Sequence, residues 1–168
     1  MKISILGLDD ERFNRMLQLI GNLFFEETEI VKVQDDTSDL IINFSLVEND
    51  LINVSAVLKD KEGNSYTESY EKELLASQTD KEQFKQIKNA VAHVYLILLQ
   101  NWTGITQKWG ILTGIRPTKL LHRKVQEGVP QEIAHQQLKD DYLITYEKIN
   151  LMQQIVDRQL AIVPDLYS

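Results

Sequence analysis

The chain has 168 residues, 43% of them apolar and 26% charged, so it can bury a sizeable core and its composition excludes a disordered protein. Its 18 Lys and Arg stand against 25 Asp and Glu, and a formal charge of −7 argues against general nucleic-acid coating. It has no cysteine, which excludes disulfides, thiolate metal sites and cysteine nucleophiles within these residues. The apolar runs are too short for a signal peptide or a membrane span, so we expect a cytoplasmic protein.

The first 104 residues carry strand and helix patterns that are typical of an α+β domain. A helix is predicted over residues 9–24, because apolar residues recur at helical spacing from Phe13 through Leu23 to Phe24 and Asp9 or Asp10 can cap the first turn. Strands are predicted over residues 2–6, 29–33, 40–45, 51–58 and 64–71, the last polar enough to form an edge.

A second, long helix is predicted from the Thr79 cap to about Trp102. Thr79 and Glu82 form a capping-box pattern, and Gly104 is placed to end the helix in a left-handed conformation. Together these elements predict an α+β fold in which a small, mostly antiparallel sheet carries two helices.

Residues 105–168 are predicted to form a separate part of the protein, a glycine-hinged basic loop followed by a helical segment. Three shorter helices are expected: one from Pro117, one from Pro130 after the Gly128–Val129 turn, and one from Tyr146 to Val163. We therefore expect domains at 1–104 and 105–168. The final residues follow a helical pattern without a polar tail, and we expect the chain to end at a domain boundary.

Positive charge is concentrated in one segment of this acidic chain. From Gln83 to Gln126 there is no Asp or Glu, but there are seven Lys or Arg. The rest of the chain holds 11 Lys and Arg against all 25 acidic residues. Such a segment indicates a localised anionic partner, with an ordinary solvated surface as the alternative.

The segment from Trp109 to Lys119 is the candidate binding site. Gly110 and Gly114 permit positive φ or close backbone approach, and Pro117 at a helix start leaves the following amides available to an anion. The candidate substrate- or partner-binding residues are Trp109, Thr113, Arg116, Thr118, Lys119 and Arg123. The alternative is that Trp109 and its aliphatic neighbours insert the loop into the core, with Arg116 paired to an acid.

Other kinds of site find little support in the sequence. The three histidines are not clustered with further ligands, so no metal site is predicted, and no motif for a catalytic nucleophile occurs. The helices from Pro117 and Pro130 allow a helix-turn-helix interpretation, but the second carries little positive charge, so a nucleic-acid partner is not expected. A purely structural or dimerising module is a third interpretation.

The run from Lys108 to Leu120 closely resembles the region just before the radical-SAM domain of HemZ-type proteins. These are oxygen-independent coproporphyrinogen III oxidase-like proteins, also called coproporphyrinogen dehydrogenases. The segments 22–27, 139–144, 156–160 and 163–167 are similar as well, so the resemblance covers the whole chain.

The resemblance implies an N-terminal accessory region that is not catalytic alone. In that family the following catalytic domain holds a [4Fe–4S] cluster on three cysteines, and the cluster cleaves S-adenosylmethionine to a radical. The radical starts the oxidative decarboxylation of two propionates of coproporphyrinogen III, which gives protoporphyrinogen IX in haem biosynthesis. None of those cysteines is present here, so both cofactors are implied only for the full-length protein.

Two partners are implied by the resemblance: the radical-SAM domain of the same polypeptide and the anionic tetrapyrrole substrate. For a tetrapyrrole with four carboxylates, Arg116 and Lys119 would be charge partners. Thr113 and Thr118 would donate hydrogen bonds, and Trp109 would offer a stacking or packing face.

Overall fold

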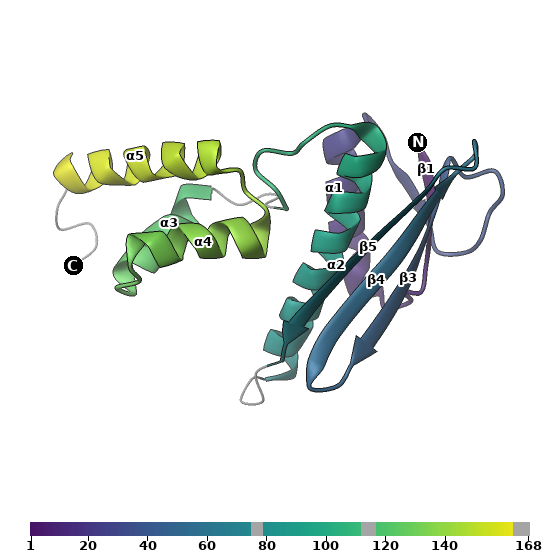
Figure 1. Cartoon of the computed structure of the whole chain (residues 1–168), viewed down its shortest axis with the longest axis horizontal. Helices are drawn as coiled ribbons and strands as arrows, with labels where there is room; N and C mark the ends of the chain where they lie inside the picture. The colour runs from purple at the N-terminus through teal and green to yellow at the C-terminus, as the bar shows by residue number, and fades with distance from the viewer. Residues whose placement is uncertain (75–78, 112–116, 163–168) are drawn as a thin grey trace. The chain divides into compact units, whose positions relative to one another are not determined.

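The computed structural model describes residues 1–74, 79–111 and 117–162. The chain divides into two compact units, Met1–Thr106 and Gln107–Ser168 (Figure 1). The first unit contains β1 (Lys2–Leu6), α1 (Asn14–Phe24), β2 (Glu29–Val31), β3 (Leu40–Glu48), β4 (Leu51–Asp60), β5 (Ser65–Glu73) and α2 (Asp80–Thr103). The second contains α3 (Pro117–Gln126), α4 (Gln131–Tyr142) and α5 (Tyr146–Ile162). Within the described ranges, no helix is both long and apolar enough to cross a bilayer.

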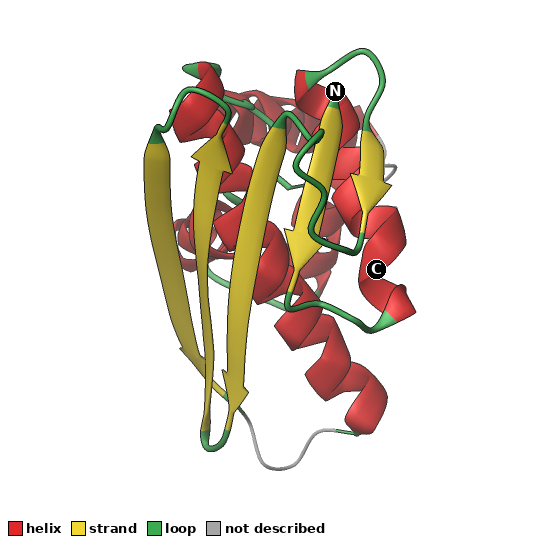
Figure 2. Ribbon diagram, turned by 90° about the vertical axis from the view of Figure 1, so that its right-hand side faces the viewer, coloured by secondary structure: helices red, strands yellow, loops and turns green. Residues whose placement is uncertain are grey.

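The first unit is built on a five-stranded sheet in the order β2-β1-β3-β4-β5. β1 runs parallel to β2 and β3, whereas the two long ladders, β3–β4 and β4–β5, are antiparallel. Figure 2 shows the strands side by side with helices behind them. The predicted α+β class is confirmed, with a sheet that is mixed because β1 pairs in parallel on both sides while the other ladders are antiparallel.

One face of this sheet forms the core of the first unit. Along β4 every second side chain from Ile52 to Leu58 is buried, and α2 packs against β4 and β5 through a long apolar surface. α1 buries Met16, Leu17 and Ile20, whereas Leu23, on the apolar face that the spacing predicts, is 40% exposed. At 100° per residue, Leu23 lies at the edge of the arc that these buried residues define.

The first helix also begins differently from the prediction. Residues Glu11–Phe13 form a 3₁₀ turn, and the α-helix starts only at Asn14. Asp10 is the cap, because its carboxylate accepts the Arg12 backbone N–H at 2.9 Å and binds the Arg12 guanidinium at 2.7 Å. These short local contacts close a tight first turn before α-helical geometry is established.

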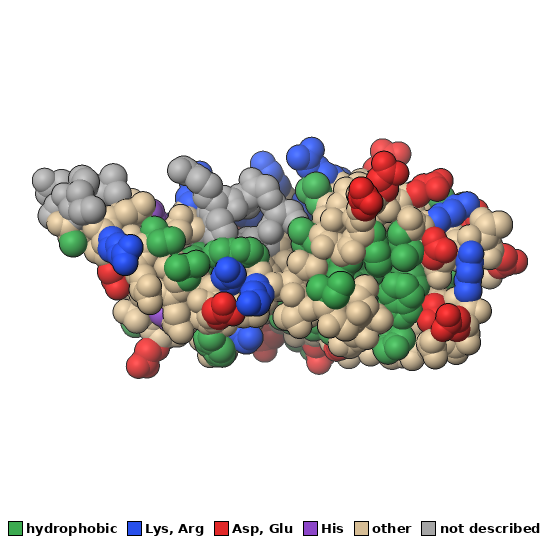
Figure 3. All heavy atoms as spheres, turned by 90° about the horizontal axis from the view of Figure 1, so that it is seen from above, with side chains coloured by type: hydrophobic (Ala, Val, Ile, Leu, Met, Phe, Trp, Pro, Cys, Tyr) green, Lys and Arg blue, Asp and Glu red, His purple; other side chains and the backbone are tan. Residues whose placement is uncertain are grey.

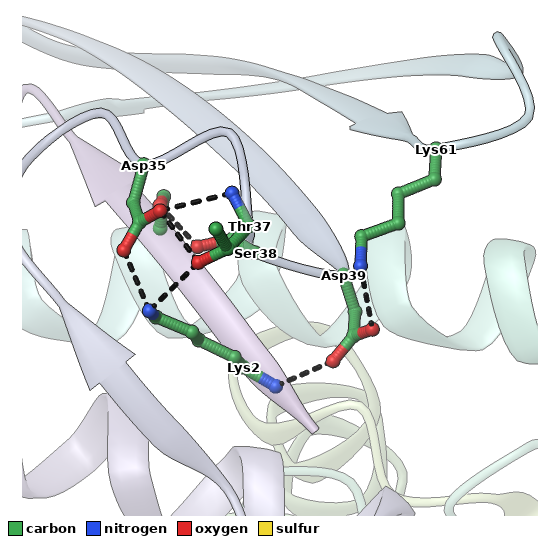
Figure 4. Close-up of polar contacts among 7 residues, drawn as sticks. Lys2, Asp35, Thr37, Ser38, Asp39 and Lys61 are labelled. Carbon is green, nitrogen blue, oxygen red and sulfur yellow. Dashed lines mark hydrogen bonds and ion pairs between the residues drawn. The ribbon is translucent and has the colours of Figure 1, made fainter.

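Polar contacts hold the connection between β2 and β3 across β1 (Figure 4). The Lys2 ammonium lies 2.6 Å from the Asp35 carboxylate, and the Lys2 backbone N–H donates to Asp39 at 2.8 Å. The buried hydroxyls of Ser4 and Ser38 share a hydrogen bond of 2.7 Å. The hydrogen bond from Lys2 holds the pKa of Asp35 well below its usual range. This network fixes the crossover that places β1 between two parallel neighbours.

α2 begins and ends as its sequence predicts. The Thr79 hydroxyl accepts the Glu82 backbone N–H at 3.2 Å, and Gly104 ends the helix with a φ of 74°. Near this end the indole N–H of Trp102 donates to Asp60 at 2.9 Å. Because Asp60 also accepts backbone N–H groups within the β4–β5 turn, one carboxylate joins the helix to the hairpin.

The hydrogen bonds to Asp60 predict that the free energy of unfolding falls in acid. Hydrogen bonds, first that from Trp102, lower the Asp60 pKa from 3.8 to about 2 in the folded chain. The folded state therefore binds the proton less readily than the unfolded state, and the stabilisation is lost as the pH falls from about 4 to about 2. Urea unfolding between pH 5 and pH 2 should show a shallower pH dependence for Asp60→Asn, and for Trp102→Phe, than for the parent. Equal slopes in all three proteins would contradict the assignment.

The second unit is a three-helix assembly with its own core. The predictions that helices begin at Pro117 and Tyr146 are confirmed, and Pro130 is the N-cap of α4. The predicted end of the last helix at Val163 lies outside the described residues. The buried core consists of Leu121, Ala134, Leu138, Ile144, Ile149, Met152 and Val156.

Candidate functional site

The two units differ in charge. Met1–Thr106 contains 10 Lys and Arg against 18 Asp and Glu, whereas Gln107–Ser168 contains 8 against 7. The first unit is therefore strongly acidic, at −8, and the second is close to neutral, at +1. On the face drawn in Figure 3, Lys and Arg side chains are visible on the helical unit at the left. An anionic ligand would meet less repulsion on the helical unit than on the sheet unit.

The start of the candidate segment is attached to the connection between α4 and α5. The Ile111 N–H donates to the Tyr142 carbonyl at 2.9 Å, and the Thr145 N–H donates to the Lys108 carbonyl at 2.9 Å. We call this pairing of Lys108–Ile111 with Tyr142–Thr145 the clamp. The Lys108 ammonium also lies 3.0 Å from Glu147 and lowers the pKa of that carboxyl. The clamp fixes Lys108–Ile111 against the α4–α5 connection.

Gly110 is required by the clamp. Its φ is 62°, and a Cβ at this position would lie 1.8 Å from the Tyr142 carbonyl oxygen. The predicted positive φ and close backbone approach are thus confirmed for Gly110. Gly114 lies outside the described residues. The opposing connection is also unusual, because Leu143 has a φ of 57° where it ends α4.

Trp109 packs against the core of the helical unit and is half-buried. The ammonium of Lys148, on α5, lies 5.2 Å from the centroid of its ring. That distance is within the range of a cation–π contact. Trp109 therefore already contacts both the apolar core and a cation of its own unit.

Helix α3 presents two cations on the side away from its buried residue. Lys119 and Arg123 are exposed and four residues apart, whereas Leu121 is fully buried. Neither cation forms an ion pair with any residue that the structure describes. Thr118 is half-buried on the same helix.

The structure brings only part of the predicted site together. Thr113 and Arg116 lie outside the described residues, so their relation to Lys119 and Arg123 stays a prediction. By contrast, the clamp partners Tyr142–Thr145 and the contact from Lys148 were missed in the sequence. The available signal was the similarity of segment 139–144 to HemZ-type proteins, which carries no structural meaning by itself.

The charge of Arg123 acts on Tyr142, the residue whose carbonyl accepts a hydrogen bond in the clamp. Burial raises the pKa of the Tyr142 phenol, the Asp141 charge adds to this effect, and the Arg123 charge opposes it.

Helix α4 has the opposite electrostatic character. It carries Glu132, Asp140 and Asp141 against Lys139, so its charge does not suit insertion into a DNA groove. Among the described residues, no three His, Asp or Glu side chains are gathered closely enough to hold a metal ion.

No protein-family model matches the chain. Among curated proteins, it is similar to the oxygen-independent coproporphyrinogen-III oxidase-like protein HemZ of Bacillus subtilis (strain 168), with 54% identity over 168 residues. The predicted resemblance to HemZ-type proteins is confirmed. The alignment covers 99% of this chain and 33% of the relative, so the chain spans about a third of that protein's length. Both units, including the sheet and the clamp, belong to the region shared with the HemZ-type protein.

Proposed function

We propose that this chain is a non-catalytic accessory region of a radical-SAM coproporphyrinogen III dehydrogenase. The observation that carries the proposal is the 54% identity to an oxygen-independent coproporphyrinogen-III oxidase-like protein across nearly the whole chain. The chain has no cysteine, so the ligands of the [4Fe–4S] cluster implied by the family would come from another part of the polypeptide. The region would support oxidative decarboxylation of the substrate without supplying its redox chemistry.

In this proposal the helical unit docks on the catalytic domain and helps to hold the anionic substrate. Lys119 and Arg123 are suited to this role because they are exposed, unpaired within the described residues and on one side of α3. The clamp supports the role indirectly, since it holds Lys108–Ile111, which precede α3 in the sequence, against the α4–α5 connection. A tetrapyrrole with four carboxylates offers more than one partner to such a pair of cations.

A titration with coproporphyrin III, the stable oxidised analogue, tests substrate binding by porphyrin absorbance and Trp fluorescence. Binding should be saturable and should weaken with added salt. Each desolvated charge-assisted contact contributes about 1.5–3 kcal/mol, so losing one should raise Kd by roughly tenfold or more, and Lys119→Ala/Arg123→Ala should raise it by roughly a hundredfold or more. Arg116→Ala should act in the same direction.

A matched control is available on α2. Lys81 and Lys85 are also exposed and four residues apart, so Lys81→Ala/Lys85→Ala removes the same charge from the other unit. That variant should leave the coproporphyrin Kd within about twofold of the parent. Equal weakening in both double variants would show a non-specific charge effect, and an absence of saturable binding would leave docking on the catalytic domain as the role of this unit.

A further inference from the structure

The outer edge of β5 is a surface that the proposed function does not use. β5 has nine residues and, among the described residues, pairs with β4 alone. Backbone hydrogen bonds join Asp60 to Asn64 and Leu74 to Asp50, so the even-numbered residues of β5 direct their N–H and C=O groups towards β4. The odd-numbered residues from Ser65 to Glu73 therefore direct these groups away from the sheet.

Ser69 shows how one outward-directed N–H group of this edge is hydrogen-bonded in the single chain. Its backbone N–H donates to the side-chain carboxylate of its neighbour Glu68 at 3.1 Å. A main-chain donor at the middle of the edge is thus bonded to a half-buried acidic side chain of its own strand rather than to another strand. Another strand could replace that side chain, as happens when an extended segment is added to a sheet edge.

We propose that β5 pairs antiparallel with β5 of a second copy of this chain, in a register centred on Tyr70. This register places Glu68 opposite Lys72 of the second copy, and the twofold symmetry repeats the pair. It also places the two Tyr70 side chains opposite each other. Opposite charges and paired aromatic residues both stabilise neighbouring strands.

The charges of β5 disfavour the neighbouring registers. A pairing centred on Glu68 or Glu71 sets two carboxylates directly opposite, and one centred on Lys72 sets two ammonium groups opposite. A pairing centred on Ser69 avoids repulsion but loses both Glu68–Lys72 pairs. Charged residues on an edge strand usually prevent pairing with another sheet, whereas here the same charges select one register. On pairing, Glu68 would exchange the Ser69 N–H for Lys72 of the second copy.

Sedimentation of the 168-residue chain at increasing concentration tests the pairing. The mass should rise from 19.5 kDa towards twice that value. Ser69→Pro should abolish the rise, because it removes an outward N–H without touching the β4–β5 ladder, whereas Ser69→Ala should keep it. Circular dichroism should show that both variants are folded. A monomer at every concentration, or a dimer that persists in Ser69→Pro, would overturn the proposal.

A charge exchange tests the register. Glu68→Lys and Lys72→Glu should each raise the dimer Kd roughly tenfold, because each creates two like-charge pairs. The double variant Glu68→Lys/Lys72→Glu restores opposite charges at both positions and should return Kd to within about threefold of the parent. Single variants without effect, or a double variant as weak as the singles, would refute pairing through this register.

Discussion

Replacing Gly110 with alanine should destabilise the helical unit by about 4 kcal/mol or more, which is at the upper end for a single substitution. A left-handed φ costs a residue with a Cβ about 1–2 kcal/mol by itself. The new Cβ would also lie 1.8 Å from the Tyr142 carbonyl oxygen, and backbone cannot yield as a side chain can. The clamp must therefore open, which loses its two backbone hydrogen bonds at about 1 kcal/mol each and part of the packing of Trp109.

Gly128 provides the matched control for this prediction. It lies in the same unit with a φ of 75°, but a Cβ there would meet nothing within 4 Å. Gly128→Ala should therefore cost only the conformational term of about 1–2 kcal/mol. Hydrogen–deuterium exchange should show faster exchange throughout α3–α5 in Gly110→Ala, with α1 and α2 unchanged. If both variants exchange alike, the clamp does not hold the helical unit together.

The local elements of this fold were predictable because their signals lie within a few residues. The alternation from Ile52 to Leu58 marks β4, and Thr79, Glu82 and Gly104 mark the ends of α2 through contacts between neighbours in sequence. The neighbours of β1 were not predictable in this way. Its parallel pairing depends on the contacts of Lys2 with Asp35 and Asp39, more than 30 residues along the chain, and no local pattern indicates them.

In the candidate site, too, features with local signals were predictable and features that depend on distant contacts were not. Helical spacing alone separates exposed Lys119 and Arg123 from buried Leu121, so the two faces of α3 follow from the sequence. The environment of Trp109 does not, because it depends on Lys148 and on the core formed by α3–α5. The sequence left a ligand role and a packing role open for Trp109. The structure describes the packing contacts of Trp109. A ligand would have to contact the part of the ring that these contacts leave accessible.

The presence of glycine at position 110 suggested a special backbone conformation or a close contact. The residues beside it in the sequence did not show which of the two applies. A glycine in a loop is compatible with an open turn, as at Gly128, or with a backbone contact, as at Gly110. Only the position of the α4–α5 connection distinguishes the two cases. Segment 139–144 shows similarity to HemZ-type proteins, and its contact with Lys108–Ile111 supplies a physical reason for both segments to be kept together.

Leu121→Ala and Lys119→Ala should separate the scaffold of α3 from its proposed binding surface. Leu121 is fully buried in the helical core, so its truncation should lower the free energy of unfolding by about 2–5 kcal/mol. Lys119 is exposed two residues earlier, and its truncation should change stability by less than about 0.5 kcal/mol. Urea unfolding followed by helical circular dichroism measures both changes.

The two substitutions should have the opposite order of effect on coproporphyrin III. At a temperature where Leu121→Ala is still folded, its Kd should stay close to the parent value, because Leu121 lies away from the exposed cations. Lys119→Ala should weaken binding although its stability is unchanged, since it removes one cation that the proposal assigns to a substrate carboxylate. If binding instead follows stability across the two variants, the porphyrin depends on the folded helical core, and Lys119 has no direct part in holding it.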